Sequence, residues 1–254
     1  MDRPSRLHDR LNAAEELEAI LENLPSEKSE IVSFLNSFSY RLMLIEKELE
    51  QKIDYWFADG QFLCIMHNIF SNRKISRLSF DFSSAAHRVF CFCRENRLRV
   101  AFIGGTADEV TAAIEYLQDA YKGMEICFYA SGYFNDERID ALHNSIIESR
   151  PDVVVTGLGT PKQEFFAAKL CEAADTRTDG KAMLIFTCGA FISQTASSGD
   201  YYPEWVKRYN LRWLYRAILE PHVRIRLLKD YPAFMVLFVR EEFLLWLRRT
   251  KRLT

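Results

Sequence analysis

The sequence lacks several features, and each absence excludes a class of protein. Its 254 residues contain no stretch of 18 uncharged apolar residues, so no membrane-spanning helix is predicted. The beginning, Met1-Asp-Arg-Pro-Ser5, has no apolar core of the kind found in a secretory signal peptide. No internal repeat and no low-complexity segment occurs. These absences favour a globular protein of the cytoplasm.

Cysteine patterns that bind metals or form disulfides are also missing. The six cysteines form no Cys-x-x-Cys pair, and no cluster of histidines lies near them. Most lie in apolar runs such as Cys91-Phe-Cys93, where cysteine usually behaves as a small buried hydrophobe. We therefore expect a reducing compartment, no disulfide framework and no zinc site.

Basic and aromatic residues gather at the C-terminal end. Residues 204–254 carry 12 Lys and Arg against 5 Asp and Glu, whereas the rest of the chain carries 21 against 30. Apolar stretches such as Phe234–Val239, together with three tryptophans, suit a helix lying on an anionic membrane surface. A solvated basic helix, a helical layer packed on the core and a dimer interface are the alternatives.

Strands and helices alternate along the chain, most regularly after Arg99. Apolar runs bounded by turn residues predict strands, and apolar residues at helical spacing predict helices, as from Arg41 to Ile53. The predicted strands are 31–35, 55–58, 100–103, 125–130, 152–156 and 182–187. We expect an α/β fold in which residues 1–203 form a Rossmann-like parallel sheet flanked by helices. Residues 204–254 would form a helical C-terminal appendage.

The turn Gly157-Leu-Gly-Thr-Pro-Lys-Gln-Glu164 follows one of these strands, at the edge where parallel sheets bind ligands. Gly157 and Gly159 allow the backbone to approach a ligand closely. The free N–H groups of a helix that starts here form an anion site suited to a diphosphate, and Lys162 adds a full positive charge.

The same turn has an explanation that needs no ligand. Thr160 as N-cap, Pro161 as first helical residue and Gln163 as reciprocal partner form a capping box. On local chemistry alone, a helix cap and a ligand site are both open.

Two further turns carry candidate residues. Asp59, beside Gly60, can accept a proton from a hydroxyl, although an Asp-Gly turn is common in any protein. Asp81 is a second acidic residue, for which a helix N-cap is the favoured interpretation. Gly104-Gly105 lies between a strand and a helix but is not a Gly-x-Gly-x-x-Gly motif, so a dinucleotide-dependent oxidoreductase is not expected.

Together these segments resemble the WecG/TagA/CpsF family of glycosyltransferases. The resemblance runs from about Ile31 to Arg226. Its most specific element is Gly157–Glu164, which matches the family's Gly-x-Gly-x-Pro-Lys-Gln-Glu signature. Further matches, in the same order along the chain, are Asn36, Ala58-Asp-Gly60, Phe102-Ile-Gly-Gly105, Gly132-Tyr-Phe134, Leu211-Arg-Trp-Leu-Tyr-Arg216 and Glu220-Pro221.

The resemblance implies an inverting glycosyltransferase in the synthesis of an exopolysaccharide, teichoic acid or surface antigen. A UDP-sugar is the implied donor and an undecaprenyl-diphosphate-linked molecule the acceptor, with no metal or other cofactor required. The implied location is cytoplasmic and peripheral, on the inner face of the cell membrane. No nucleic acid partner is expected, and a homo-oligomer is an open alternative to a monomer.

The resemblance also assigns roles to residues. Asp59 becomes the candidate catalytic base, and Asn36 lines the same pocket. The candidate donor-binding residues are Gly104, Gly105, Gly132, Tyr133, Gly157, Gly159, Pro161, Lys162, Gln163 and Glu164. Three arginines of the appendage, Arg216, Arg224 and Arg226, are candidates for contact with the diphosphate.

This chain departs from the family pattern mainly on the acceptor side and in the appendage. Ser193, Tyr201, Arg212 and Val223 stand where the family has Asp, a basic residue, Glu and Arg, and the hydroxyl before the Asn36 motif is absent. We therefore expect a sugar or an acceptor that differs from those of the best-known members. A nucleotide-sugar-binding regulatory module and an inactive paralogue are the alternative functions.

Overall fold

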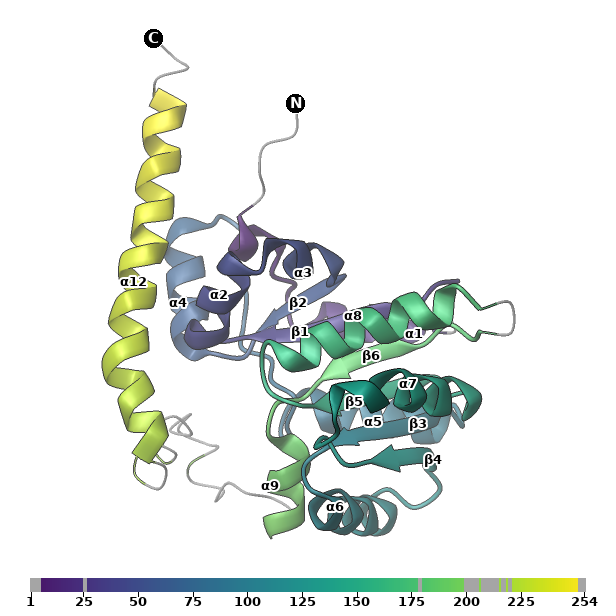
Figure 1. The fold of residues 1–254 in the computed structure, drawn as a ribbon. Coiled ribbons are helices and arrows are strands. Elements are labelled where there is room, and N and C mark those ends of the chain that lie inside the picture. The colour runs from purple at the N-terminus through teal and green to yellow at the C-terminus, as the bar shows by residue number, and fades with distance from the viewer. Residues whose placement is uncertain are drawn as a thin grey trace.

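The protein is built on one six-stranded parallel sheet (Figure 1). The computed structural model describes residues 6–24, 27–177, 180–198 and 221–250, and the single positions 206, 215 and 218. The strand order is β2-β1-β6-β5-β3-β4. The strands are β1 Glu30–Leu35, β2 Tyr55–Ala58, β3 Arg99–Gly104, β4 Glu125–Ala130, β5 Val153–Gly157 and β6 Leu184–Thr187. All six predicted strands are confirmed, with ends that agree to within two residues.

Helices cover both faces of the sheet, as predicted for a doubly wound α/β fold. The first face is covered by α2 Ser37–Ile45, α3 Lys47–Lys52, α4 Gln61–Phe70, α7 Ile139–Glu148 and α8 Lys162–Asp175. The second is covered by α1 Glu16–Glu22, α5 Ala85–Glu95, α6 Ala107–Ala120 and α9 Phe191–Ser198. Two short 3-10 helices, η1 Leu7–Arg10 and η2 Asp136–Arg138, and the C-terminal helix α12 Pro221–Thr250 complete the described elements.

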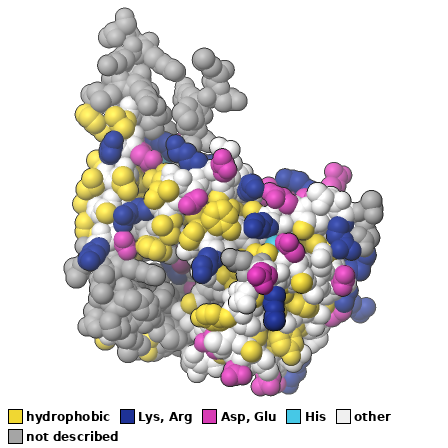
Figure 2. All heavy atoms as spheres, in the orientation of Figure 1, with side chains coloured by type: hydrophobic (Ala, Val, Ile, Leu, Met, Phe, Trp, Pro, Cys, Tyr) yellow, Lys and Arg dark blue, Asp and Glu magenta, His cyan; other side chains and the backbone are white. Residues whose placement is uncertain are grey.

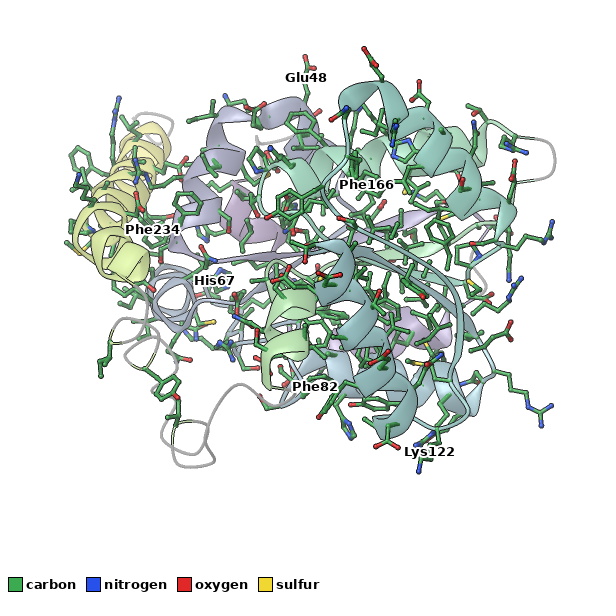
Figure 3. All side chains as sticks on the ribbon, turned by 60° about the horizontal axis from the view of Figure 1, so that its bottom comes forward. Glu48, His67, Phe82, Lys122, Phe166 and Phe234 are labelled. Carbon is green, nitrogen blue, oxygen red and sulfur yellow. The ribbon has the colours of Figure 1, made fainter. Side chains whose placement is uncertain are left out.

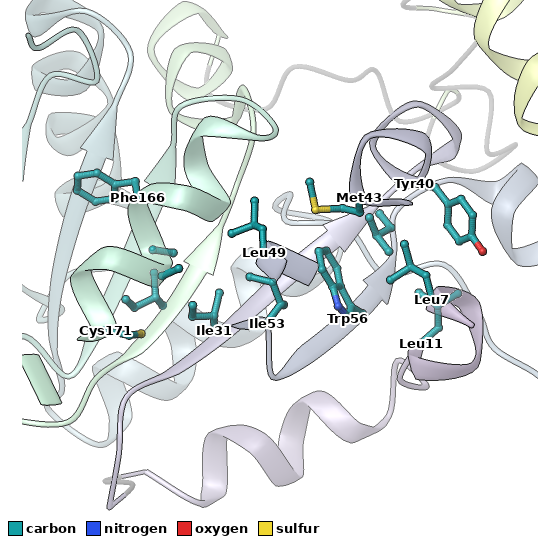
Figure 4. Packing of buried hydrophobic residues seen from close by; sticks show 14 of the residues in the cluster. Leu7, Leu11, Ile31, Tyr40, Met43, Leu49, Ile53, Trp56, Phe166 and Cys171 are labelled. Atoms are coloured by element: carbon teal, nitrogen blue, oxygen red, sulfur yellow. The ribbon is translucent and has the colours of Figure 1, made fainter. Parts of the chain in front are cut away.

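The apolar core is divided by the sheet, because alternate side chains of each strand point to opposite faces. In β5, Val154 belongs to the first layer, whereas Val153 and Val155 belong to the second. Figure 4 shows the first layer, where Trp56 of β2 packs beside Leu49 of α3. A strand with both faces buried reads as a continuous apolar run, which is why the sequence pattern identified these strands.

The single helix predicted for residues 41–53 is wrong, since the chain breaks at Glu46 into α2 and α3. Met43 and Leu49 are both buried, and six residues on one continuous helix would place them on different sides. The break lets each helix turn a buried residue to the sheet. Ile45, which fits the predicted apolar spacing, is 75% exposed as a result.

The C-terminal helix α12 packs beside α2 and α4 (Figure 1). Phe234 and Phe238 are fully buried and contact Tyr40 of α2, with ring centroids 5.3 and 5.9 Å apart. Figure 3 shows Phe234 on the side of α12 that faces the rest of the protein. Glu242 of the same helix lies 2.7 Å from the buried Nε2 of His8 in η1. Part of α12 therefore belongs to the core, which agrees with the packed-layer alternative for the appendage.

The opposite side of α12 exposes apolar residues. Figure 2 shows hydrophobic side chains gathered over this helix, and the exposed ones are Met235, Val236, Val239, Phe243 and Leu244. Within the described part of the chain, no helix combines the length and apolarity needed to cross a membrane. The helix thus has one face in the core and exposes apolar side chains on another.

Two substitutions on α12 separate these faces. Phe238→Ala should lower the free energy of unfolding by about 3–5 kcal/mol, because it empties a buried site. Val236→Ala, at a residue 65% exposed, should change it by less than about 0.5 kcal/mol. Urea denaturation followed by circular dichroism measures both. Equal losses in the two variants would show that α12 is not packed as described.

Candidate active site

The carboxyl ends of all six strands meet at one edge of the sheet, and most of them carry glycine. In spatial order the residues at or just after the strand ends are Gly60, Asn36, Gly189, Gly157, Gly104 and Gly132. This edge is where ligands bind in open parallel sheets, and helices α2, α4, α6, α8 and α9 start close to it in sequence.

The glycines are required because backbones touch along this edge. A Cβ atom on Gly104 would lie 2.7 Å from the Gly157 oxygen, and one on Gly157 would lie 2.6 Å from the Gly189 oxygen. A Cβ on Gly132 would lie 2.9 Å from the Gly104 Cα. Side chains are therefore excluded from three neighbouring strand ends, those of β4, β3 and β5, which present backbone groups instead.

A capping box starts α6. Thr106 Oγ1 accepts from the Glu109 N–H at 3.2 Å, and Glu109 Oε2 accepts from the Thr106 N–H at 2.7 Å. Ser193 of α9, which stands in place of the family's Asp, donates to the same Glu109 oxygen at 3.1 Å. Gly105, at φ +63°, lies against this group. The departure at position 193 thus places a hydroxyl group against the Glu109 carboxylate.

Beyond Gly104, the edge continues to the turn after β4. The Gly132 N–H donates to the Gly105 oxygen at 2.8 Å, which joins the two turns. Ser131 donates to the same oxygen at 3.0 Å. Tyr133 is 79% exposed, so its ring is free to meet a ligand at this end of the edge.

The predicted cap at the start of α8 is wrong in detail. The helix begins at Lys162, Pro161 occupies the N-cap position, and no side chain caps it. Thr160 does not cap because its hydroxyl bonds to side chains: it accepts from Gln163 Nε2 at 3.3 Å and donates to Glu164 Oε1 at 3.1 Å. Gln163 is likewise not a reciprocal cap, since its Oε1 accepts from the Gly189 N–H at 3.1 Å.

Lys162 and Glu164 lie in very different surroundings. The Lys162 side chain is exposed on the first turn of α8, next to Gly157 and Gly159 in sequence. Glu164 is 1% exposed, and its Oε1 accepts from Ser33 of β1 at 3.0 Å and from Gln163 Nε2 at 2.9 Å. Burial raises the pKa of Glu164. Lys162 faces solvent at the edge, whereas Glu164 lies beneath it.

Asp59 follows β2 and pairs with Arg77. The Arg77 guanidinium donates to Asp59 Oδ1 at 2.9 Å and to the Asp59 backbone oxygen at 2.6 Å. Burial disfavours the charge of Arg77, but Asp59 and Asp81 outweigh it and raise the Arg77 pKa. The Asp59 side chain is 35% exposed, and no described residue donates to its Oδ2. One carboxylate oxygen is held by Arg77, and the other faces outward.

Asp81 is not the N-cap of α5, as predicted, because Ser84 occupies that position. Its carboxylate instead accepts from the Ser83 N–H at 3.0 Å and from Arg77 at 3.5 Å. It therefore orders the turn before α5 and helps to hold Arg77.

Asn36 and Asp59 are neighbours, since the Asp59 N–H donates to the Leu35 oxygen at 2.7 Å and Gly60 contacts Asn36. Asn36 Oδ1 caps α2 by accepting from the N–H groups of Phe38 and Ser39, at 3.0 and 3.1 Å. The cap leaves the Asn36 amide nitrogen without a donor contact to any described residue. The structure thus brings the two candidate catalytic residues together.

The appendage arginines are described only in part. Arg216 lies outside the described residues, as do Tyr201 and Arg212. Arg224 and Arg226 lie in the first two turns of α12. Their predicted contact with a diphosphate stays a prediction.

Sequence reasoning missed Arg77. This residue lies in Ile75-Ser-Arg-Leu-Ser-Phe80, whose three apolar side chains are all buried. A basic residue among buried apolar neighbours needs an acidic partner, and that signal could have identified it. Ser33 was missed as well, because a single serine inside an apolar strand carries no local pattern.

The arrangement suits transfer of a group away from a diphosphate. Backbone N–H groups and the start of α8, near Gly157 and Gly104, are groups of the kind that can stabilise phosphate charge. The Asp59 carboxylate lies at the end of β2, three strand spacings from β5, or about 14 Å. An extended anionic ligand can lie between the two along the edge.

Comparisons with known proteins identify the group of enzymes. The model of the glycosyl transferase WecG/TagA/CpsF family matches residues 6–248. The chain is 37% identical over 230 residues to a UDP-Gal:alpha-D-GlcNAc-diphosphoundecaprenol beta-1,4-galactosyltransferase of Shigella boydii, covering 90% of this chain and 93% of that protein. It is 28% identical over 192 residues to an N-acetylglucosaminyldiphosphoundecaprenol N-acetyl-beta-D-mannosaminyltransferase of Bacillus subtilis, covering 74% and 70%. The chain belongs to the glycosyl transferase WecG/TagA/CpsF family.

Proposed function

We propose that this glycosyltransferase moves galactose from UDP-galactose to N-acetylglucosamine carried on undecaprenyl diphosphate, in the synthesis of a bacterial surface polysaccharide. The observation that carries the proposal is the glycine-lined edge, with an outward carboxylate oxygen of Asp59 at one end. The choice of donor rests on the Shigella boydii galactosyltransferase, which is more similar than the N-acetylmannosaminyltransferases and is matched over more of its length.

In the proposed reaction, Asp59 is the general base. Its Oδ2 takes the proton of the acceptor hydroxyl, while Arg77 holds Oδ1 and neutralises the carboxylate charge in the resting site. The hydroxyl oxygen attacks the anomeric carbon as the bond to the UDP oxygen breaks, which inverts the configuration at that carbon. The Asn36 amide nitrogen supplies a hydrogen-bond donor beside this base.

The nucleotide is proposed to bind on the β5-β3-β4 side of the edge. The diphosphate accepts from backbone N–H groups at Gly104, Gly105, Gly157 and Gly159, and Lys162 balances its charge. The exposed Tyr133 ring and Gly132 lie at the β4 end and would receive the nucleoside. Arg216, Arg224 and Arg226 would close the site over the diphosphate.

The appendage is proposed to bind the inner face of the cytoplasmic membrane peripherally, where a lipid-linked acceptor resides. The apolar face of α12, with Met235, Val239 and Phe243, enters the interface, and the basic residues meet anionic headgroups. On this proposal residues 1–203 form the catalytic part and residues 204–254 the membrane-contacting part. The alternative is that the apolar face of α12 forms the interface of a homo-oligomer.

Asp59→Asn should lower kcat by about 10²–10⁴-fold, because the amide cannot take the proton. UDP-galactose affinity should stay within about threefold, since the donor lies elsewhere on the edge. UDP release with a short-chain polyprenyl-diphosphate N-acetylglucosamine acceptor measures kcat, and calorimetry measures binding. Asp119→Asn, at a residue 84% exposed on α6, is the matched control. Undiminished turnover in Asp59→Asn would show that Asp59 is not the general base. If the wild type binds the donor but releases no UDP, a regulatory module or an inactive paralogue is favoured.

Gly157→Ala should weaken UDP-galactose binding about tenfold or more, because a Cβ there lies 2.6 Å from the Gly189 oxygen and displaces the strand end. Gly123→Ala is the control: it strains the backbone at a glycine of positive φ, +92°, but lies between α6 and β4, away from the edge. Calorimetry and thermal unfolding of both variants separate binding from stability. If Gly123→Ala weakens binding equally, the glycine edge is not the donor site.

The double variant Val239→Glu, Phe243→Glu should bind vesicles of anionic lipid about tenfold less well, because it removes apolar area that enters the interface. Tyr129→Glu, at a residue 48% exposed on the edge strand β4, is the control. Vesicle sedimentation at two salt concentrations measures binding. Wild-type binding by the double variant would exclude this face as the membrane contact.

A further inference from the structure

A row of hydroxyl groups crosses the buried first face of the sheet beneath the candidate active site. Thr156 of β5 pairs with Thr187 of β6, whose Oγ1 donates to Ser33 Oγ of β1 at 2.8 Å. The neighbouring residues on this face, such as Ile185 and Val154, are apolar core residues. Three adjacent polar residues in a core are costly unless their hydrogen bonds are satisfied.

These bonds converge on a single oxygen of Glu164. Its Oε1 accepts from Ser33 at 3.0 Å, from Thr160 at 3.1 Å and from Gln163 Nε2 at 2.9 Å. Its Oε2 is buried and has no hydrogen-bond partner, and Glu164 forms no ion pair with any of the described residues. An ionised carboxylate would leave charge on an oxygen that receives no donor.

A proton on Oε2 removes that charge. Oε1 is then the carbonyl oxygen, which accepts, and Oε2–H is a donor. Thr156 Oγ1, in the same row, is also buried without a hydrogen-bond partner, so it does not act as a donor to Oε2. Burial raises the pKa of Glu164, in the direction that keeps this proton bound.

Gln163 connects Glu164 to the carboxyl-terminal edge of the sheet. Its Nε2 is held by Glu164 and Thr160, which turns its Oε1 toward the Gly189 N–H, 3.1 Å away. Gly189 in turn lies against Gly157. The position of Gly189, in the turn after β6, therefore depends on the orientation of the Gln163 side-chain amide. Glu164 fixes that orientation by accepting from Gln163 Nε2.

We propose that Glu164 is a positioning residue that acts as a neutral, proton-bearing carboxyl group and holds the Gln163–Gly189 contact in place beneath the donor. It does not touch substrate and exchanges no proton in the reaction. The link to donor binding rests on the proposed function, whereas the state of the carboxyl group does not.

Glu164→Gln tests the charge, because an amide also offers one accepting oxygen and a donor in place of O–H. We expect kcat and the KM for UDP-galactose to stay within about threefold of wild type. Glu164→Ala should raise that KM about tenfold or more, since three donors lose their acceptor. Glu172→Gln, at an exposed residue of the same helix, is the control. If Glu164→Gln is folded and as impaired as Glu164→Ala, the negative charge is needed and the proposal is overturned.

The pH dependence gives a second readout. Because the pKa of Glu164 is raised, the neutral form is present below that pKa and is lost as pH rises through it. UDP-galactose affinity of the wild type should fall on the alkaline side, and that fall should be absent in Glu164→Gln. The same fall in both proteins would contradict the proposal.

Infrared difference spectroscopy tests whether Glu164 is neutral, independently of the proposed function. At pH 7 the wild type should show the carbonyl band of a protonated carboxyl group that is missing in Glu164→Gln and present in Glu172→Gln. The band tests the neutral state even if no UDP-sugar is turned over. A wild-type spectrum without this band would show that Glu164 is ionised and would overturn the proposal.

Discussion

The close approach of backbone to backbone at the carboxyl ends of the strands is the constraint on which the site depends. Gly132, Gly104, Gly157 and Gly189 form a continuous line in which each of the first three has no room for a Cβ atom. The line brings four turns within contact of one another. A ligand at this edge therefore meets N–H and C=O groups whose positions are set by the sheet. Shape and hydrogen bonding, rather than many charged side chains, define this side of the site.

Periodicity predicted the fold because the strands other than the edge strand β4 are largely buried on both faces and the helices on one. It failed where the chain satisfies two constraints at once. The helix break at Glu46 allows both Met43 and Leu49 to be buried. No local pattern shows which apolar residue becomes exposed instead. The prediction that Thr160 caps α8 is wrong for a different reason: the Thr160 hydroxyl forms hydrogen bonds with the side chains of Gln163 and Glu164.

The candidate site was predictable where a motif carries it, as at Asp59 and Gly157. It was not predictable where residues far apart in sequence meet. Ser33 and Glu164 are 131 positions apart and come together only through the order of the strands. Arg77 reaches Asp59 because the irregular segment before α5 lies along β2, where the Leu78 N–H donates to the Ala58 oxygen at 2.9 Å. Single-sequence patterns contain no information on such pairings.

The position of β6 in the sheet has a consequence for folding during synthesis. This strand is the last of the six in sequence, yet it lies between β1 and β5 and pairs with both. Until Leu184–Thr187 leaves the ribosome, the nascent chain can form β1 with β2 and β3 with β4 and β5, but not one sheet. The two half-sheets keep exposed edges until the four-residue strand β6 pairs with both of them. Such late, non-local pairing slows folding and exposes edges to aggregation.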